Sequence, residues 1–233
     1  MMLKNINLSR VLFLDIETVP EKYNYKELNS NKKKIWEEKY GGEKEYPKSS
    51  MLAEFGKIIC ISVGFFNLKT SKKRSFRVKS FIGEEIEILE NFKALCDTHF
   101  HLKSSLLCAH NGREFDFPFI ARRMIINKVK LPKILDMHEK KPWEIPHLDT
   151  LYLWKFGDYK SSISLRLLSE VLGLSSKKIK LQGEQIANKF YLEKQIDKIV
   201  EYCENDVLVL SQVILRFRND RLLDDEEVVF LKN

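Results

Sequence analysis

The sequence predicts an α/β fold in which a mixed central sheet is flanked by helices. Three observations lead to this prediction: strand patterns are grouped early in the chain, later strands alternate with helical patterns, and a long amphipathic helical stripe follows near the end. Strands that first follow one another and then alternate with helices are typical of layered α/β folds. At 233 residues and 44% hydrophobic content, the chain can bury a sizeable core.

Four segments have the pattern of buried or partly buried strands. They are rich in β-branched, aromatic and other apolar residues and lie at 11–16, 57–66, 75–81 and 105–110. Pro20 should end the first strand, and Lys69 to Lys73 should form the turn between the second and the third. Residues 21–55 are polar and charged, which favours a surface insertion with one helix near Trp36.

Helical spacing of apolar residues predicts the remaining elements. They lie at 84–99 and 117–126, after a cap at Asp149 or Thr150, from Ser162 or Ser164 to Gly173, and at 192–217. Pro118 suits the first position of its helix, which leaves Asp116 just before or at the helix N-terminus. We expect the charged tail from Asp220 to be frayed or loosely docked.

Composition limits the classes of function. The formal net charge of +7 and the pI near 9.1 favour a polyanionic partner such as nucleic acid, although many basic proteins have none. The four cysteines form no Cys-x-x-Cys pair, which argues against a zinc site or a disulfide framework and favours a reducing compartment. No signal pattern is visible, and the apolar stretch at 58–66 is too short to span a bilayer. We therefore expect a soluble cytoplasmic protein.

Two acids stand at the end of the first predicted strand. Residues i and i+2 of a strand point to the same face, so Asp15 and Glu17 project together. Paired carboxylates attract a cation, and a divalent metal would offset the cost of burying them. The alternative is that both belong to the polar turn that begins at Thr18, because a D-x-E triplet is common.

Three further residues extend this candidate site. Asp116 precedes a helix, where an acid can also act as a cap. Tyr202 and Asp206 lie four residues apart in the long helical stripe and therefore share one face. Read singly, a Tyr and a surface acid on an amphipathic helix are ordinary features. The combination of all five residues favours catalysis.

The segments 14-LDIET-18, 111-NGREFD-116 and 202-YCEND-206 occur in the order and approximate spacing of the three exonuclease motifs of the DEDD superfamily. The chain resembles the DEDDy branch, because the histidine branch would need His at the position of Glu201. It is most similar to stand-alone bacterial exonucleases that resemble the proofreading domain of family B DNA polymerases. This resemblance extends from about residue 11 to 217 and implies a ribonuclease H-like fold.

The resemblance also implies roles for single residues. Two Mg²⁺ or Mn²⁺ ions, which suit hard carboxylate oxygens, would be held by Asp15, Glu17, Asp116 and Asp206. Tyr202 would position the attacking water or help to deprotonate it, and positioning is favoured because an unperturbed tyrosine has a pKa of about 10. The terminal nucleotide would be bordered by Thr18, Asn111 and Phe115, although these are equally ordinary turn and core residues.

The implied activity is 3′-5′ exonuclease action: hydrolysis of phosphodiester bonds from the 3′ end of nucleic acid, with single-stranded DNA as the expected substrate and nucleoside 5′-monophosphates as products. Two alternatives stay open. One is a 3′-5′ exoribonuclease, because 2′-hydroxyl contacts cannot be read from sequence, and the other is a non-catalytic nucleic-acid-binding module. We expect residues 1–233 to form one exonuclease domain, which replication or repair proteins could recruit.

Overall fold

The computed structural model describes residues 3–67, 74–158, 160–174 and 183–231. Its centre is a six-stranded sheet with the strand order β5-β4-β1-β2-β3-β6. β1 is antiparallel to β2 and parallel to β4, so the sheet is mixed, as the sequence predicts. The strands are β1 (Val11–Pro20), β2 (Gly56–Asn67), β3 (Ser75–Ile82), β4 (Leu106–Ala109), β5 (Leu148–Asp149) and β6 (Val228–Phe230).

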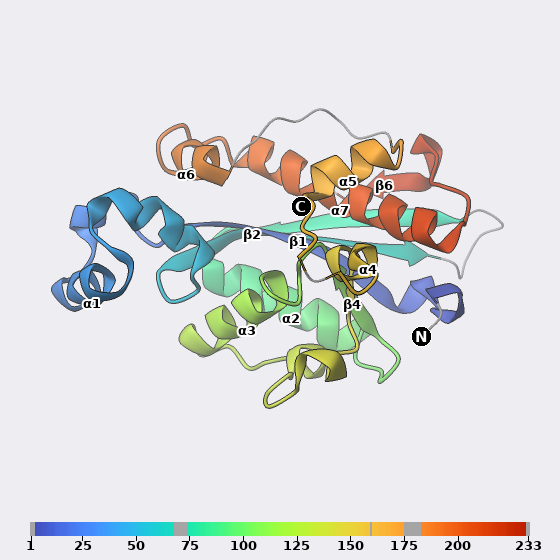
Figure 1. Ribbon diagram of the computed structural model, residues 1–233, viewed down its shortest axis with the longest axis horizontal. Coiled ribbons are helices and arrows are strands. Elements are labelled where there is room, and N and C mark those ends of the chain that lie inside the picture. Colours follow the sequence, from blue (N-terminus) through green and yellow to red (C-terminus); the bar gives the residue numbers. More distant parts are fainter. Residues whose placement is uncertain (1–2, 68–73, 159, 175–182, 232–233) are drawn as a thin grey trace.

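Helices cover both faces of the sheet (Figure 1). The described α-helices are α1 (Ser30–Tyr40), α2 (Glu85–His99), α3 (Asp116–Ile126), α4 (Thr150–Lys155), α5 (Leu165–Val171), α6 (Gly183–Tyr191) and α7 (Ile196–Arg218). α2 and α3 lie on one face, whereas α5, α6 and α7 lie on the other. Short 3-10 helices occur at η1 (Leu3–Asn5), η2 (Leu8–Arg10), η3 (Tyr25–Glu27), η4 (Glu43–Met51), η5 (Lys133–Leu135), η6 (Pro142–Glu144) and η7 (Asp225–Glu227).

The alternation of side chains along β1 divides the core into two layers. Leu12 and Leu14 pack on the side of α2 and α3, in a cluster with Phe92. Phe13 points the opposite way and packs in a second cluster with Val207 of α7. Residues of β1 at steps of two from Phe13 therefore also face α7.

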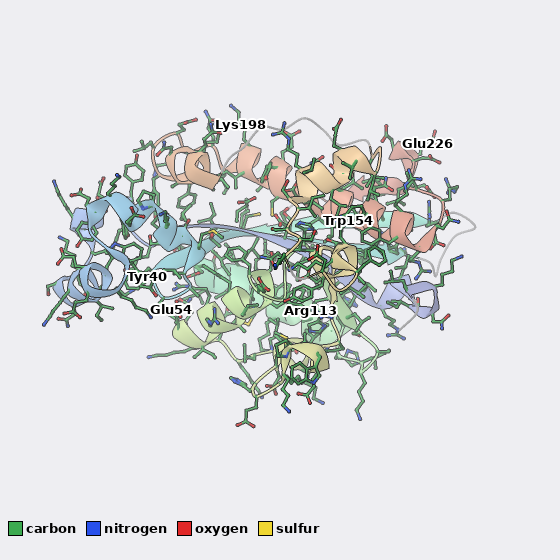
Figure 2. All side chains as sticks on the ribbon, viewed as in Figure 1. Tyr40, Glu54, Arg113, Trp154, Lys198 and Glu226 are labelled. Carbon is green, nitrogen blue, oxygen red and sulfur yellow. The ribbon has the colours of Figure 1, made fainter. Side chains whose placement is uncertain are left out.

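Residues 21–55 build a hydrophobic cluster of their own at one end of the molecule (Figure 1). The predicted helix near Trp36 is α1, and the Trp36 side chain is buried. Its ring stacks on Tyr40 at 4.9 Å and meets Phe55 edge-on at 5.1 Å. In Figure 2 Tyr40 marks this region, while Arg113 lies near the centre of the molecule.

Two predicted helix caps are confirmed. The Asp149 carboxylate accepts the Leu151 backbone N–H at 3.0 Å at the start of α4, and the Ser164 hydroxyl accepts that of Leu167 at 3.2 Å at the start of α5. α3 differs slightly from prediction, since it begins at Asp116 and Pro118 is its third residue.

The C-terminal part differs from the sequence expectation. α6 was not predicted, and the tail expected to fray adds a parallel strand, β6, beside β3. An ion pair of 3.0 Å between Arg74 and Glu227 holds this tail in place. The predicted turn at 69–73 lies outside the described residues. Of the helices in the described ranges, none has both the length and the apolar character needed to cross a membrane.

Candidate active site

Asp15 and Glu17 occupy the face of β1 that looks toward α7. Asp15 pairs across the sheet with Ser62 of β2, and Glu17 pairs with Cys60. The register between the strands then shifts between Glu17 and Thr18. Such a bulge bends the strand and redirects side chains, and bulges are common beside active sites. The two acids therefore stand directly before the point where the regular ladder is interrupted.

α7 brings the second part of the site. It packs across β1 and β2, with Val207 and Leu210 buried against the sheet. Tyr202 and Asp206 lie one helical turn apart, and the Tyr202 hydroxyl donates a hydrogen bond to the Asp206 carboxylate. The buried apolar stripe of α7 thus fixes which face of the helix carries these two residues.

Asp116 comes from the other side of the sheet, at the first turn of α3. Its carboxylate accepts the backbone N–H of Ile16, the residue between Asp15 and Glu17. This hydrogen bond ties the start of α3 to the end of β1. The four predicted acids and Tyr202 are therefore brought together from three segments that lie far apart in the sequence.

Burial raises the pKa values of all four carboxylates, and the charges of neighbouring acids in the cluster raise those of Asp15 and Glu17 further. Burial, followed by the charges of Asp206 and Asp116, raises the pKa of Asp15 well above its usual value. Burial and the neighbouring Asp15 do the same to Glu17. Burial also raises the pKa of Asp116 to about 7 and that of Asp206 to about 6, the latter against a lowering by the Tyr202 hydrogen bond. A cation would relieve this repulsion.

The pKa of Tyr202 is raised first by burial and then by the charge of Asp206. The phenol therefore keeps its proton at neutral pH and acts as a hydrogen-bond donor. This agrees with a role in orienting water and not with removal of a proton from it.

Sequence reasoning missed Cys203 as a neighbour of the acids. Its thiol donates to Asp15 Oδ2 at 3.3 Å and to the Asp15 backbone oxygen at 3.4 Å. Side-chain atoms of Asp15, Glu17 and Cys203 lie within 4.8 Å of one another, a spacing that a metal ion can bridge. The oxygen donors suit Mg²⁺ or Mn²⁺, whereas the buried thiol, with its raised pKa, is suited to hold Asp15 in place. Cys203 lies three residues before Asp206 on the same predicted helix, and this spacing could have predicted that its thiol lies near the acids.

Asp149 organises the loop that leads to Asp116. Besides capping α4, its carboxylate accepts the backbone N–H groups of Asn111 and Arg113, each at 3.0 Å. Asn111 has a left-handed backbone with φ of 62°, as suits an Asn-Gly turn. Its side-chain oxygen Oδ1 is buried and has no hydrogen-bond partner among the described residues. The sequence predicted that Asp149 caps α4 but not that it also holds the backbone of Asn111 and Arg113.

The other two residues expected at the terminal nucleotide have partners within the protein. The Thr18 hydroxyl donates to the backbone oxygen of Ser50 at 2.8 Å and thereby links β1 to η4. The partly buried Phe115 ring packs on Phe119 at a centroid distance of 5.3 Å. Both stand next in sequence to an acid of the cluster, Thr18 beside Glu17 and Phe115 beside Asp116.

Comparison with known proteins identifies the family. A family model described as a predicted 3′-5′ exonuclease related to the exonuclease domain of PolB matches residues 49–227, well over half of the chain. The chain belongs to this exonuclease family. The matched range contains Asp116, Tyr202 and Asp206 but begins after Asp15 and Glu17. The two acids of β1 are placed beside Asp116 and Asp206 by the contacts and charge interactions described above.

Other comparisons define the fold of this predicted exonuclease. No curated protein matches the chain. Among solved structures, it is similar to the family B DNA polymerase from the hyperthermophilic archaeon Pyrobaculum calidifontis, with a TM-score of 0.53 and 13% identity. The likeness covers 90% of this chain but only 26% of that polymerase. It supports the ribonuclease H-like α/β fold implied by the motifs.

Proposed function

We propose that the chain is a two-metal-dependent 3′-5′ exonuclease that acts on single-stranded DNA and releases nucleoside 5′-monophosphates. The observation that carries this proposal is the convergence of four carboxylates, Asp15, Glu17, Asp116 and Asp206, from β1, α3 and α7. A buried group of like charges is costly unless a cation compensates it. Membership of a predicted 3′-5′ exonuclease family supports the reaction class.

In this proposal the four carboxylates hold two Mg²⁺ or Mn²⁺ ions. When bound, such ions supply Lewis-acid stabilisation of a phosphodiester and lower the pKa of water. Cys203 and the Ile16 backbone N–H hold two of the carboxylates, those of Asp15 and Asp116, in place for this task. The donor set is made of oxygens, and hard cations prefer such ligands.

The remaining residues would orient the substrate and the nucleophile. The Tyr202 hydroxyl donates its one proton to Asp206, so its oxygen is suited to accept a hydrogen bond from a water molecule and align it against the terminal phosphodiester. Asn111 would border the terminal nucleotide through the turn that leads to Asp116. Phe115 and Thr18 would flank that nucleotide beside their neighbouring acids.

The test is a cleavage assay with matched single-stranded oligonucleotides that carry a label at the 3′ or the 5′ end. With Mg²⁺ or Mn²⁺, the wild-type protein should release labelled mononucleotide from the 3′ end and shorten 5′-labelled DNA stepwise. EDTA should abolish cleavage, and Asp15→Ala should lower its rate by about 100-fold or more. The exposed acid Glu90 on α2 provides the control, because Glu90→Ala should retain the full rate.

The same assay separates the alternatives. Faster degradation of RNA than of DNA would replace the substrate with RNA and leave the reaction intact. Tight binding of oligonucleotides with no cleavage under any metal would support a binding module instead. Equal rates in wild type and a clean Asp15→Ala preparation would contradict the proposed site.

A further inference from the structure

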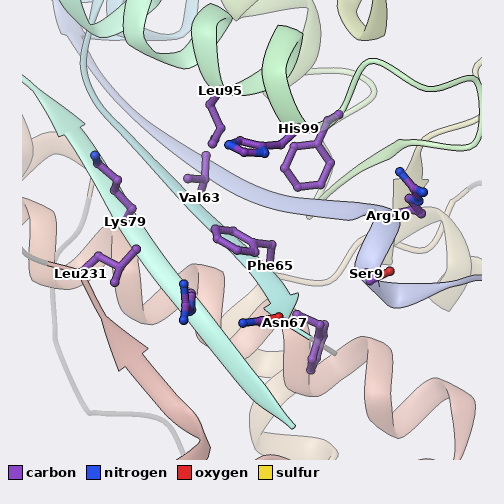
Figure 3. Close-up of a pocket in the computed structure, with 12 residues that line it drawn as sticks. Ser9, Arg10, Val63, Phe65, Asn67, Lys79, Leu95, His99 and Leu231 are labelled. Carbon is purple, nitrogen blue, oxygen red and sulfur yellow. The ribbon is translucent and has the colours of Figure 1, made fainter. Parts of the chain in front are cut away.

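A cavity lies on the opposite face of the sheet from the carboxylate cluster. Its volume is about 420 Å³, and its lining includes Val63 and Phe65 of β2 and Leu95 and His99 of α2. Val63 follows Ser62, the cross-strand partner of Asp15, and therefore points to the other side of the sheet. The cavity is thus separate from the site already described, and Figure 3 shows its walls.

Cationic side chains surround this cavity. Arg77 lies directly across the ladder from Phe65, and Lys79 lies across from Val63, so both cations stand on the cavity side of β3. Arg10 enters from η2 and lies on the opposite side of Phe65 from Lys79 (Figure 3). Among the described residues that line the cavity, none is acidic.

Within the part of the chain that the structure describes, these cations have no ion-pair partner. Across the described ranges of the chain, no carboxylate pairs with Arg10, Arg77 or Lys79, and Lys79 only approaches the face of the Phe81 ring, at 5.5 Å. Three positive charges around one hollow create a local field that attracts anions. Guanidinium groups are especially suited to phosphate, which they can bind through two parallel hydrogen bonds.

The floor of the cavity is apolar and aromatic. The Phe65 ring is partly exposed, and Phe100 packs edge-on against it at a centroid distance of 6.3 Å. This fixes the orientation of Phe65 and leaves part of the ring open to the cavity. An exposed aromatic ring is a platform for a nucleobase, and its stacking contact tolerates any base. The cavity volume also falls within the range of about 300–1,000 Å³ for small-molecule sites.

We propose that this cavity is a second nucleotide-binding site, in which a base packs on Phe65 and its phosphates meet the cations on either side. The choice of a nucleotide over another aromatic anion rests on the proposed function, because that activity presents the protein with strands and with mononucleotides. The bound unit comes either from a free mononucleotide or from a single strand that passes over this face. Both sources offer the same base and phosphate chemistry.

Equilibrium binding to the full chain in EDTA tests the proposal without catalysis. The probes are deoxyadenosine 3′,5′-bisphosphate, dAMP, deoxyadenosine, inorganic phosphate and a short single-stranded DNA. We expect the bisphosphate to bind most tightly. Deoxyadenosine and phosphate should each bind at least about tenfold more weakly than dAMP. Rising salt should weaken binding of the charged probes.

Variants locate the binding. Arg77→Gln and Phe65→Leu should each reduce nucleotide affinity by about tenfold, whereas Arg122→Gln, a matched exposed arginine on α3, should leave it unchanged. If Arg77→Gln loses binding of dAMP, the ligand of the cavity is a free mononucleotide. If the variant loses only binding of the short single-stranded DNA, the ligand is a strand. Equal affinities for phosphate and dAMP, or equal effects of Arg77→Gln and Arg122→Gln, would overturn the proposal.

The outcome can be distinguished from failure of the proposed exonuclease activity. Arg77→Gln should cleave a short oligonucleotide with Mg²⁺ at the wild-type rate, since Arg77 lies on the other face of the sheet from Asp15. Cleavage without nucleotide binding in the cavity would refute only this second site. Binding that depends on Arg77 in a protein without nuclease activity would refute only the proposed reaction.

Discussion

The carboxylate of Asp149 accepts the backbone N–H of Asn111 at 3.0 Å, and through this contact it holds the turn that precedes Asp116. The same buried side chain also binds the N–H groups of Arg113 and Leu151. Hydrogen bonds to a charged acceptor contribute about 1.5–3 kcal/mol. One side chain therefore couples the stability of α4 to the position of α3.

We expect Asp149→Ala to lower both stability and activity, because it leaves several backbone N–H groups without an acceptor. The free energy of unfolding in urea should fall by about 2–4 kcal/mol. Asp149→Asn keeps one acceptor oxygen and should lose less than Asp149→Ala. If the two variants retain wild-type cleavage rates at a temperature where both are folded, Asp149 does not position the active site.

A second prediction concerns the buried ion pair between α2 and α3. Glu85 accepts Arg123 Nε at 2.8 Å and the Ile58 backbone N–H at 2.7 Å, and both charged side chains are largely buried. Glu85→Gln leaves the Arg123 charge buried without its partner and should cost about 3–5 kcal/mol in the free energy of unfolding.

An exposed pair on α2 provides the control for this measurement. Lys93 and Asp97 form an i,i+4 contact of 2.6 Å near the surface. Asp97→Asn should change the free energy of unfolding by less than about 1 kcal/mol. Similar small losses in both variants, measured by urea unfolding, would contradict the structural importance of Glu85.

The carboxylate cluster predicts an unusual pH dependence of stability in the metal-free protein. Burial raises the pKa of Asp116 to about 7, whereas an unfolded Asp titrates near about 3.9. The folded state therefore binds more protons between these values, and the contribution of Asp116 to stability falls as pH rises from 4 toward 7. Above that window the full cost of the charge is present.

Thermal unfolding of wild type and Asp116→Asn in EDTA tests whether the contribution of Asp116 to stability falls as the pH rises. The neutral amide avoids the charge, so the variant should gain stability relative to wild type as the pH rises through that window. Added Mg²⁺ should reverse the trend by stabilising wild type more than the variant. A constant difference in melting temperature across this range would argue against a charged, buried Asp116.

Gly64 of β2 provides a prediction about α7. A Cβ atom at this position would lie 2.3 Å from Phe76 Cζ and 2.7 Å from Val207 Cγ1. Gly64→Ala should therefore overpack the interface, cost about 1–3 kcal/mol and displace the segment of α7 next to Asp206. Calorimetric unfolding and Mn²⁺ titration measure the two effects. Gly42→Ala, where no atom lies within 4 Å, is the control and should leave both measurements unchanged.

The elements that the sequence predicts well are those with local signals. β1 begins with a continuous apolar run, α7 has strong apolar periodicity, and the caps at Asp149 and Ser164 act within three residues of their own positions. β6 has no such signal, because Val228–Phe230 is short and becomes a strand only by pairing with the distant β3. α6 is short and lacked a recognised cap in the sequence.

In the candidate site, too, the sequence predicts some features and not others. The motifs specify Asp15, Glu17, Asp116, Tyr202 and Asp206, because each has a fixed place within a short pattern. The contacts that hold these residues were not predictable. Cys203 reaches Asp15 from a segment 188 residues away, and Asp149 reaches Asn111 from 38 residues away. Such partners are set by how the elements pack and not by local sequence.

The assembly of the carboxylate cluster from β1, α3 and α7 has a consequence during protein synthesis. A nascent chain carries Asp15 and Glu17 from the start but lacks Asp206 until α7 has left the ribosome and docked on the sheet. The complete set of acids therefore forms only after α7 has been synthesised and has docked on the sheet.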